Sequence, residues 1–343
     1  MDYRISIVIA ILLAISPVIH SIDFEDYDED VAALLREYQN QSNPDQSYTP
    51  SILSYSTAKT SKTIVDFERG IIYMNASTPE TLRDAIIDVV LTQIDPSVID
   101  AQTAIDFGLI NEETNKPFFW GQVLDHKGKP ISSRRPALDF ANFLLRKKTF
   151  SDGRFEVTIR MIDAHKKIAG AKYVSFVKAA CREYSVSSSL VMAIMETESS
   201  FNPLARSRSN ALGLMQVKAN TAGRDYFSLI KGYKHTPSSK FLYSPKNNIE
   251  VATGYLNILS SRYLRGIEDP KKLEYAMISS YNGGAGNLWK SLDKSGNKTK
   301  ALKRINQMST KQFYWFLTNR HIRQETREYL KKVNDRKSKY TLI

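Results

Sequence analysis

Cysteine is almost absent from this chain, which has a single example, Cys181, in 343 residues. One cysteine can form neither an intramolecular disulfide nor a thiolate zinc cage. The 5 histidines show no metal-like spacing, and no Gly-x-Ser-x-Gly element of a serine hydrolase occurs. We therefore expect no catalytic metal and no cofactor. Cys181 lies in an apolar helical pattern and is interpreted as a small core residue.

Long hydrophobic runs are also scarce, which excludes a multi-span membrane protein. The run over residues 7–15 falls short of the roughly 20 apolar residues that cross a bilayer. Arg4 precedes it and Ser16-Pro17 follows, a pattern typical of a secretory signal, which we assign to residues 1–21. An uncleaved N-terminal anchor is the alternative. No cysteine follows the run, so we expect an exported, periplasmic chain without a lipid-bearing cysteine.

Acidic side chains become sparse in the second half of the chain. Residues 1–165 carry 16 basic and 24 acidic side chains, a net charge of −8, whereas residues 166–343 carry 32 and 12, a net charge of +20. Such a difference indicates two modules, the second suited to an acidic polymer. Nucleic acid is the competing interpretation. We expect no nucleic acid, because an exported chain meets little of it and no helix has the required basic and aromatic layout.

The first module is expected to be an α+β domain over residues 63–164, preceded by an acidic and polar linker over residues 22–62. A β-hairpin is predicted around the turn Glu68-Arg69-Gly70, followed by a helix capped by Thr78. Further strands are predicted over residues 118–124 and 155–162. We find no site chemistry in this domain.

The second module, residues 165–343, has helical apolar spacing throughout and is predicted to be all-α. Glycine 283 and glycine 284 end one of its helices. The expected helices cover residues 173–184, 188–199, 211–225, 247–263, 271–281, 286–292, 300–308, 310–317 and 325–333.

Glu198 is the most informative residue of this module. At about 100° per residue, Glu198 falls between Leu190 and Met195 on the apolar face of its helix, while Glu196 falls on the far side. Burial favours the neutral form of a carboxyl group, and a neutral carboxyl is what a general acid requires. The alternative is that the helix frays at its end and Glu198 simply reaches water.

Four motifs, the first of which contains Glu198, occur in an order typical of one family: Glu198-Ser199, Gly213-Leu214-Met215-Gln216, Tyr281-Asn282-Gly283-Gly284, and Tyr329 in a late helical pattern. Each motif is weak alone, but together they resemble the lysozyme-like soluble lytic transglycosylase domain. The resemblance implies an all-α lysozyme-like (goose-type) transglycosylase domain after the α+β N-terminal domain. Residues 66–72 and 117–123 are similar to the first domain of membrane-bound members, and the likeness covers nearly all of residues 60–340. Such members are typically lipoproteins, so the missing lipid-bearing cysteine is a departure.

The resemblance implies cleavage of the β-1,4 bond between N-acetylmuramic acid and N-acetylglucosamine in peptidoglycan, leaving a 1,6-anhydromuramic acid end. It makes Glu198 the acid and then the base, with Tyr329 orienting it. The implied substrate-binding residues are Ser207 and Ser209 beside the acid, Met215 and Gln216 in the cleft wall, and Tyr281 and Asn282 in the cleft. Without the resemblance, each of these residues has a purely structural interpretation. Ser207 and Ser209 would lie in a solvated loop, and Met215 would be buried beside a capped Gln216. Asn282 would begin a turn, and Tyr329 would be an ordinary packed tyrosine.

Two other functions stay open from the sequence. A goose-type lysozyme-like hydrolase shares the helical bundle but delivers water; the absence of a second acid near the motifs argues against it. A non-catalytic murein-binding protein is disfavoured because the acid, its tyrosine and the cleft motifs are all present. The expected partner is therefore peptidoglycan glycan strands, and a peripheral association with the outer membrane is left open.

Overall fold

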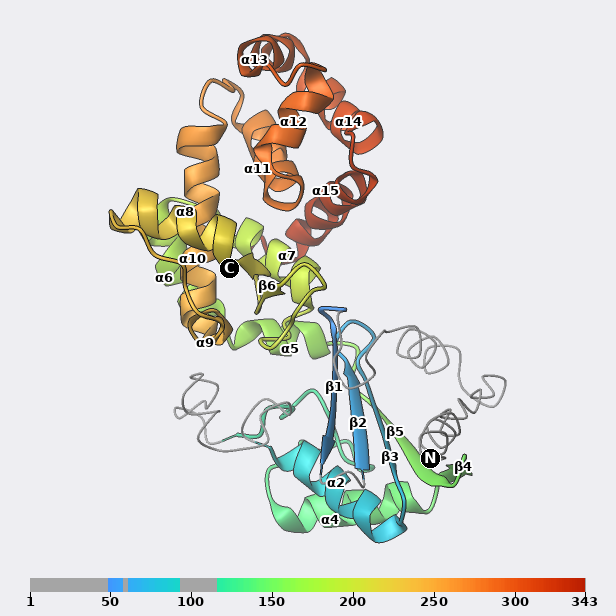
Figure 1. Ribbon diagram of the computed structural model, residues 1–343. Helices are drawn as coiled ribbons and strands as arrows, with labels where there is room; N and C mark the ends of the chain where they lie inside the picture. The colour runs from blue at the N-terminus through green and yellow to red at the C-terminus, as the bar shows by residue number, and fades with distance from the viewer. Residues whose placement is uncertain (1–48, 58–60, 93–115, 343) are drawn as a thin grey trace, which may run out of the picture.

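The computed structural model describes residues 49–57, 61–92 and 116–342. The signal expected over residues 1–21 and the linker up to residue 48 lie outside these ranges. An antiparallel sheet with helices is followed by a larger helical domain, with α5 (His165–Ala171) where the two meet (Figure 1). The predicted order, α+β and then helical, is confirmed. Within the described ranges, no helix is long and apolar enough to cross a membrane.

The N-terminal domain is built on a five-stranded antiparallel sheet with the order β1-β2-β3-β5-β4. Leu53, Val65, Ile72 and Ile159 pair in register across four of these strands and are all buried. Helix α2 contacts β2, β3 and β5 and also packs on α4. The bounds are β1 Ile52–Thr57, β2 Ser61–Asp66, β3 Ile71–Ala76, β4 Thr149–Ser151, β5 Arg154–Arg160, α2 Pro79–Leu91 and α4 Arg134–Leu145.

Local sequence signals explain the elements that were predicted here. The hairpin of β2 and β3 turns at residues 67–70, as expected. Thr78 caps α2 by accepting a 3.2 Å hydrogen bond from the backbone N–H of Thr81, and Pro79 takes the first helical position. Val157 and Ile159 point into the core from β5, as the alternating pattern predicted.

Two predictions for the N-terminal domain are wrong. The polar segment assigned to the linker supplies β1 and the start of β2, because an edge strand needs few apolar residues and Ile52 and Leu53 suffice. Residues 118–124 form turns with isolated bridges rather than a strand. Their aromatic side chains pack locally instead: the rings of Phe118 and Phe119 lie 5.0 Å apart and both contact Phe67.

The C-terminal domain surrounds α7 with one continuous apolar core. Cys181 is buried in that core, as expected. Figure 1 shows α15 returning from the far end of the domain to lie beside α7, which it contacts. The helices are α6 Val174–Tyr184, α7 Ser188–Ser199, α8 Arg224–Tyr226, α9 Ser239–Tyr243, α10 Pro245–Ile258, α11 Pro270–Gly283, α12 Ala285–Leu292, α13 Lys298–Gln307, α14 Thr310–Arg320 and α15 Gln324–Lys337, with shorter turns η1 Ala219–Gly223, η2 Phe227–Lys231, η3 Leu259–Tyr263 and η4 Ser338–Tyr340.

The helix predicted over residues 211–225 is the main error in this domain. Residues 211–218 form a small hairpin of β6 (Ala211–Leu212) and β7 (Val217–Lys218), and helical structure starts only at η1. Gly213 has φ +72°, where an added Cβ would lie 2.5 Å from Nδ2 of Asn248. The domain is therefore helical with one short two-stranded sheet, and not strictly all-α.

Candidate active site

Helix α7 presents Glu198 one residue before its end. The helix does not fray there: Ser200 adopts the left-handed conformation and its N–H closes on the carbonyl of Glu196. The hydroxyl of Ser199 donates a 2.8 Å hydrogen bond to the carbonyl of Leu214. The frayed-helix alternative is thereby excluded, and Glu198 is held on an ordered turn.

The carboxyl of Glu198 is half-buried and meets the hydroxyl of Tyr329 from α15. Tyr329 donates a 2.6 Å hydrogen bond to its Oε1. Desolvation raises the pKa of Glu198 from its ordinary value of 4.5 to about 7, and the charge of Glu325 adds to the rise. The Tyr329 hydrogen bond and the charge of Lys218 act in the opposite direction. Desolvation is the largest of these effects, so the Glu198 carboxyl keeps its proton to near-neutral pH.

Glu196 lies on the other side of α7, as the helical wheel predicted, but it is the more buried of the two acids. Its side chain is 1% exposed. Lys339 binds its Oε1 at 3.0 Å, and the Tyr340 hydroxyl donates a 2.7 Å bond to its Oε2. Glu196 therefore anchors the C-terminal segment rather than taking part in the Glu198 site.

Tyr281 from α11 stands beside the same carboxyl. Burial and the nearby charge of Glu198 raise the pKa of the Tyr281 hydroxyl well above its ordinary value. That hydroxyl donates a 2.7 Å hydrogen bond to the carbonyl of Met215. The Met215 side chain is completely buried, so the structure departs from the expectation that it forms part of the cleft wall. Met215 instead supports Tyr281 through its backbone.

Asn248 on α10 holds the loop that carries Met215. Its Oδ1 accepts the Met215 N–H at 2.8 Å, and its Nδ2 donates to the carbonyl of Leu212 at 2.8 Å. The sequence analysis missed this residue, although a signal existed: Asn248 precedes Ala252 by one turn on the buried face of its helix. A polar residue on an apolar stripe is the same signal that identified Glu198.

Gln216 is turned inward and is only 8% exposed. Its Nε2 donates hydrogen bonds to the carbonyls of Ala205 and Gly213 at 3.1 and 3.0 Å. Its Oε1 is a buried acceptor with no hydrogen-bond partner among the described residues. Leaving a buried acceptor unpaired costs free energy, and within the described ranges the Gln216 amide is held in place by its Nε2 hydrogen bonds alone.

The remaining residues that are expected to bind substrate are Ser207, Ser209 and Asn282. The hydroxyls of Ser207 and Ser209 lie 3.2 Å apart in the loop before β6. Asn282 joins α11 to α15, because its Nδ2 donates to Glu325 Oε1 at 3.2 Å and its Oδ1 accepts from the Thr326 hydroxyl at 2.6 Å. Among the predicted site residues, the structure brings Tyr329 and Tyr281 to Glu198, and the Ser199 hydroxyl ties the hairpin loop to α7 through the Leu214 carbonyl.

Two charged residues near Glu198 escaped the sequence analysis. Lys218 ends β7, and Glu325 stands four residues before Tyr329 on α15, one turn away on the same face. The statement that no second acid lies near the motifs is therefore wrong. Both oxygens of Glu325 already accept hydrogen bonds, one from Asn282 and one from Arg323 at 2.9 Å. The i, i+4 spacing from Tyr329 was the available signal.

Chemically, the site offers one carboxyl that can both give and take a proton near neutral pH, oriented by a tyrosine. Within the described ranges no group of three or more His, Cys, Asp or Glu side chains could hold a metal ion. The proton chemistry of Glu198 is thus the feature that distinguishes this region.

Comparisons with known proteins cover both domains. Residues 175–303 match the transglycosylase SLT domain, and residues 31–172 match the N-terminal domain of membrane-bound lytic murein transglycosylase C. The chain is 41% identical over 301 residues to membrane-bound lytic murein transglycosylase C of Edwardsiella ictaluri, covering 85% of this chain and 82% of that protein. The Salmonella typhimurium protein of the same name is 41% identical over 297 residues, covering 84% and 81%.

Among solved structures, an inactive mutant of the lytic transglycosylase Slt of Pseudomonas aeruginosa is 22% identical with a TM-score of 0.35. The 70 kDa soluble lytic transglycosylase of Escherichia coli is 24% identical with a TM-score of 0.37. Each match covers 48% of this chain and 23% of the other. The two domain matches and the identity along most of the chain carry the assignment: this chain belongs to the membrane-bound lytic murein transglycosylase C family and is a lytic transglycosylase, a peptidoglycan-cleaving lyase.

Proposed function

We propose that this lytic transglycosylase works with Glu198 as its single acid and base and leaves a 1,6-anhydromuramic acid end. The observation that carries the proposal is the half-buried Glu198 carboxyl, whose pKa is raised to about 7 and which accepts a 2.6 Å hydrogen bond from Tyr329. A group that titrates near the working pH serves both proton transfers well.

In the first step the Glu198 carboxyl gives its proton to the oxygen of the β-1,4 bond between N-acetylmuramic acid and N-acetylglucosamine. The bond from C1 of the muramic acid to that oxygen breaks, and positive charge develops on the muramic ring. In the second step the C6 hydroxyl of the same ring attacks C1, and its proton returns to Glu198. One bond is exchanged for another and no water is consumed.

The neighbouring residues suit an N-acetylated sugar. The unpaired acceptor Oε1 of Gln216 matches the N–H of an acetamido group in chemistry, but it is buried, so the Gln216 side chain would have to turn toward the substrate to accept that hydrogen bond. Tyr281, held by the Met215 carbonyl, forms a second wall beside Glu198. Ser207 and Ser209 add hydroxyls on the loop before β6, and Asn282 orients Glu325 and α15. We assign these residues to substrate binding, and Met215 to support of Tyr281 through its backbone carbonyl.

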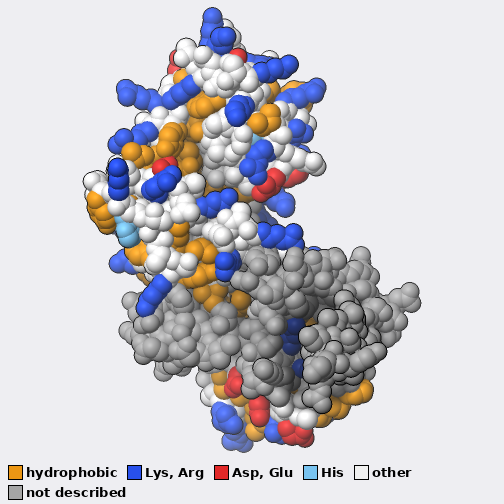
Figure 2. All heavy atoms as spheres, viewed as in Figure 1, with side chains coloured by type: hydrophobic (Ala, Val, Ile, Leu, Met, Phe, Trp, Pro, Cys, Tyr) orange, Lys and Arg blue, Asp and Glu red, His pale blue; other side chains and the backbone are white. Residues whose placement is uncertain are grey.

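The surface charge fits an acidic polymer. Lys and Arg side chains are spread over the face of the helical domain seen in Figure 2, where Asp and Glu are few. Peptidoglycan strands carry peptides with free carboxylates, which such a surface attracts. We propose that the enzyme is exported and acts in the periplasm, in peripheral association with the outer membrane.

Digestion of purified sacculi, followed by product masses, tests the reaction. The wild-type chain should release muropeptides with anhydro ends, 18 mass units lighter than reducing ends, which is the mass of one water. Glu198→Gln should lose at least about a thousandfold in rate yet sediment with sacculi as the wild type does. Glu328→Gln is the matched control, because Glu328 is an exposed acid on α15 that pairs with Lys331 on the same helix. Turnover by Glu198→Gln would refute the proposal.

Glu325 gives a specific reason to test hydrolysis as the second candidate, because it places another carboxylate within electrostatic reach of Glu198. A two-carboxylate enzyme would need Glu325 to act on water. Glu325→Gln would then abolish turnover, and the wild type would yield reducing ends. Under the transglycosylase proposal Glu325→Gln keeps its anhydro products and only lowers the pKa of Glu198, because the negative charge that raised it is gone.

A further inference from the structure

Glu68, in the N-terminal domain, is held on a turn that cannot easily move. Asp66 Oδ1 accepts the backbone N–H groups of Glu68 and Arg69 at 2.8 and 2.9 Å. Gly70 closes the turn at φ +68° against His165, where an added Cβ would lie 2.8 Å from the imidazole ring. The His165 ring also bonds the carbonyl of Phe67 at 3.1 Å. The turn between β2 and β3 is thereby fixed against α5.

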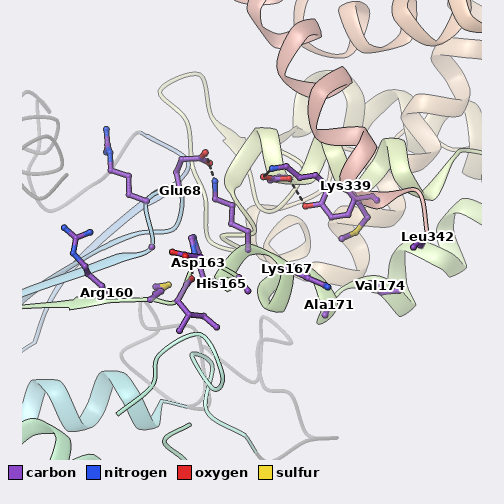
Figure 3. Close-up of a pocket in the computed structure, with 18 residues that line it drawn as sticks. Glu68, Arg160, Asp163, His165, Lys167, Ala171, Val174, Lys339 and Leu342 are labelled. Carbon is purple, nitrogen blue, oxygen red and sulfur yellow. Dashed lines mark hydrogen bonds and ion pairs between the residues drawn. The ribbon is translucent and has the colours of Figure 1, made fainter. Parts of the chain in front are cut away.

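From this turn, the Glu68 carboxylate reaches three partners in the catalytic domain. Its Oε1 accepts from Lys166 Nζ at 2.6 Å and from Arg336 Nη2 at 2.9 Å, and its Oε2 accepts from the hydroxyl of Ser200. These cations lower the pKa of Glu68, against the effect of burial, so it is ionised at neutral pH. Figure 3 shows Glu68 pointing from the N-terminal domain toward the helices, with a dashed line to its lysine partner.

Two of these partners belong to the helices that carry the active site. Ser200 caps α7 two residues after Glu198. Arg336 lies in the last turn of α15, seven residues after Tyr329 and so on nearly the same face. Arg336 also donates from Nη1 to the carbonyl of Glu196 at 3.0 Å. One carboxylate therefore ties the end of α7 to the end of α15.

Helices α7 and α15 also pack directly on each other, and Arg336 joins them through the Glu196 carbonyl, so the Glu68 contacts add to this packing from the side of the N-terminal domain. A cavity of about 940 Å³ separates the domains there, lined by Glu68 and His165 on one side and by Glu196 and Tyr340 on the other (Figure 3). The polar contacts of Glu68 cross this gap, so they set how α7 and α15 meet the N-terminal domain.

We propose that Glu68 is a positioning residue for the transglycosylase reaction. It fixes α7 against α15 so that the Tyr329 hydroxyl stays in hydrogen-bonding distance of Glu198, which gives the N-terminal domain a direct part in catalysis. This inference rests on the proposed roles of Glu198 and Tyr329.

Glu68→Gln in the full-length chain tests the inference, because it keeps the size of the side chain and removes its charge. We expect kcat on soluble peptidoglycan strands to fall about tenfold while KM changes less than about twofold. Loss of the Tyr329 bond also moves the alkaline limb of the pH profile upward. Glu198 faces Tyr329 and Glu325 on α15, Lys218 on β7 and Tyr281 on α11. Tyr329 and Glu325 both move with α15, but the Tyr329 hydrogen bond affects the pKa of Glu198 more than the Glu325 charge does, so the limb moves upward.

A double-mutant cycle with Tyr329→Phe separates positioning from simple stabilisation. If Glu68 acts through Tyr329, Glu68→Gln should change kcat less than about twofold once the hydroxyl is gone. A tenfold loss in both backgrounds, or a wild-type kcat with only a lower melting temperature, overturns the proposal. Ser200→Ala, which cuts the tie from the α7 side, should reproduce the loss in kcat if Glu68→Gln proves poorly folded.

Glu328→Gln serves as the control, since it removes an exposed ion pair from α15 without touching α7. The two proposals can fail separately. If Glu198→Gln is inactive but Glu68→Gln matches the wild type, the positioning role is wrong and the mechanism stands. If Glu198→Gln turns over substrate, both are wrong.

Discussion

The Tyr329 hydroxyl and the Glu198 carboxyl, 131 residues apart in the chain, meet at 2.6 Å. This hydrogen bond has two effects on Glu198. It orients the acid, and it stabilises the ionised form, which lowers the pKa that burial has raised. A pKa of about 7 is the balance of the two, and it keeps Glu198 able both to donate and to accept a proton.

The activity should fall above neutral pH. Glu198 must be protonated when the substrate binds, and its pKa is about 7. We expect kcat/KM, which reports the free enzyme, to be level below about pH 7 and to fall about tenfold per pH unit above it. Product release from soluble strands between pH 5 and pH 9 measures this. A profile whose limb lies near pH 4.5 would show that Glu198 behaves as an ordinary exposed carboxyl.

Tyr329→Phe should change both the rate and the pH profile. Removing the hydroxyl takes away a hydrogen bond that lowers the pKa of Glu198, so the alkaline limb moves to higher pH. The acid also loses its orientation, and we expect kcat to fall about 10- to 100-fold. The same assay measures both effects. An unchanged limb together with a reduced rate would mean that the tyrosine does not reach the carboxyl in solution.

Glu198→Gln should stabilise the protein at alkaline pH. The folded state keeps the Glu198 proton to about pH 7, whereas the unfolded chain releases it near 4.5. The folded state thus binds more protons between these values, so this group's contribution to stability decreases as the pH rises through that window. Glutamine avoids the cost of a buried charge and should add about 1–2 kcal/mol at pH 8 and nearly nothing at pH 4.

Thermal unfolding at the two pH values measures this difference, with Glu328→Gln as the exposed control that should show none. Equal melting temperatures for Glu198→Gln and the wild type at pH 8 would mean that the ionised carboxylate is well solvated. Glu198→Gln is thus expected to be more stable but inactive, because the burial that suits the Glu198 carboxyl for catalysis also costs stability at alkaline pH.

Much of the catalytic centre could be predicted from local pattern. The helical wheel placed Glu198 on the apolar stripe of α7, where the structure holds it half-buried. It did not predict that Glu196, on the opposite face, is buried more deeply, because the core surrounds α7 on nearly all sides. The bounds of α7 were predicted to the residue from the same apolar spacing. Tyr329 and Tyr281 were placed by resemblance, and the structure brings both to the same carboxyl.

The hairpin at residues 211–218 could not be predicted, because Ala211, Leu214 and Met215 recur at helical spacing. What decides the conformation is Asn248, more than 30 residues away, which takes the backbone groups a helix would use. Glu68 was likewise read as part of a simple turn. Its partner Arg336 is 268 residues distant, and no local pattern carries that pairing.

Gly213→Ala should disturb the hairpin and, through it, the active site. A Cβ at this position would lie 2.5 Å from Asn248 Nδ2 and 2.7 Å from the carbonyl of Leu242, with φ at +72°. We expect a loss of about 3 kcal/mol or more in the free energy of unfolding. The activity should fall as well, because the displaced loop carries the Met215 carbonyl that holds Tyr281.

Gly232→Ala provides the matched comparison, because Gly232 also has a positive φ, +82°, but an added Cβ there meets nothing within 4 Å. Gly232→Ala should lower the free energy of unfolding by about 1 kcal/mol, because alanine disfavours a positive φ. The turnover rate should stay unchanged. Denaturant unfolding and turnover of both variants separate crowding from backbone strain. Equal losses in the two variants would show that the Asn248 contact does not shape the hairpin. A larger loss in Gly213→Ala, together with reduced turnover, would show that the packing of α10 against this loop keeps Tyr281 beside Glu198.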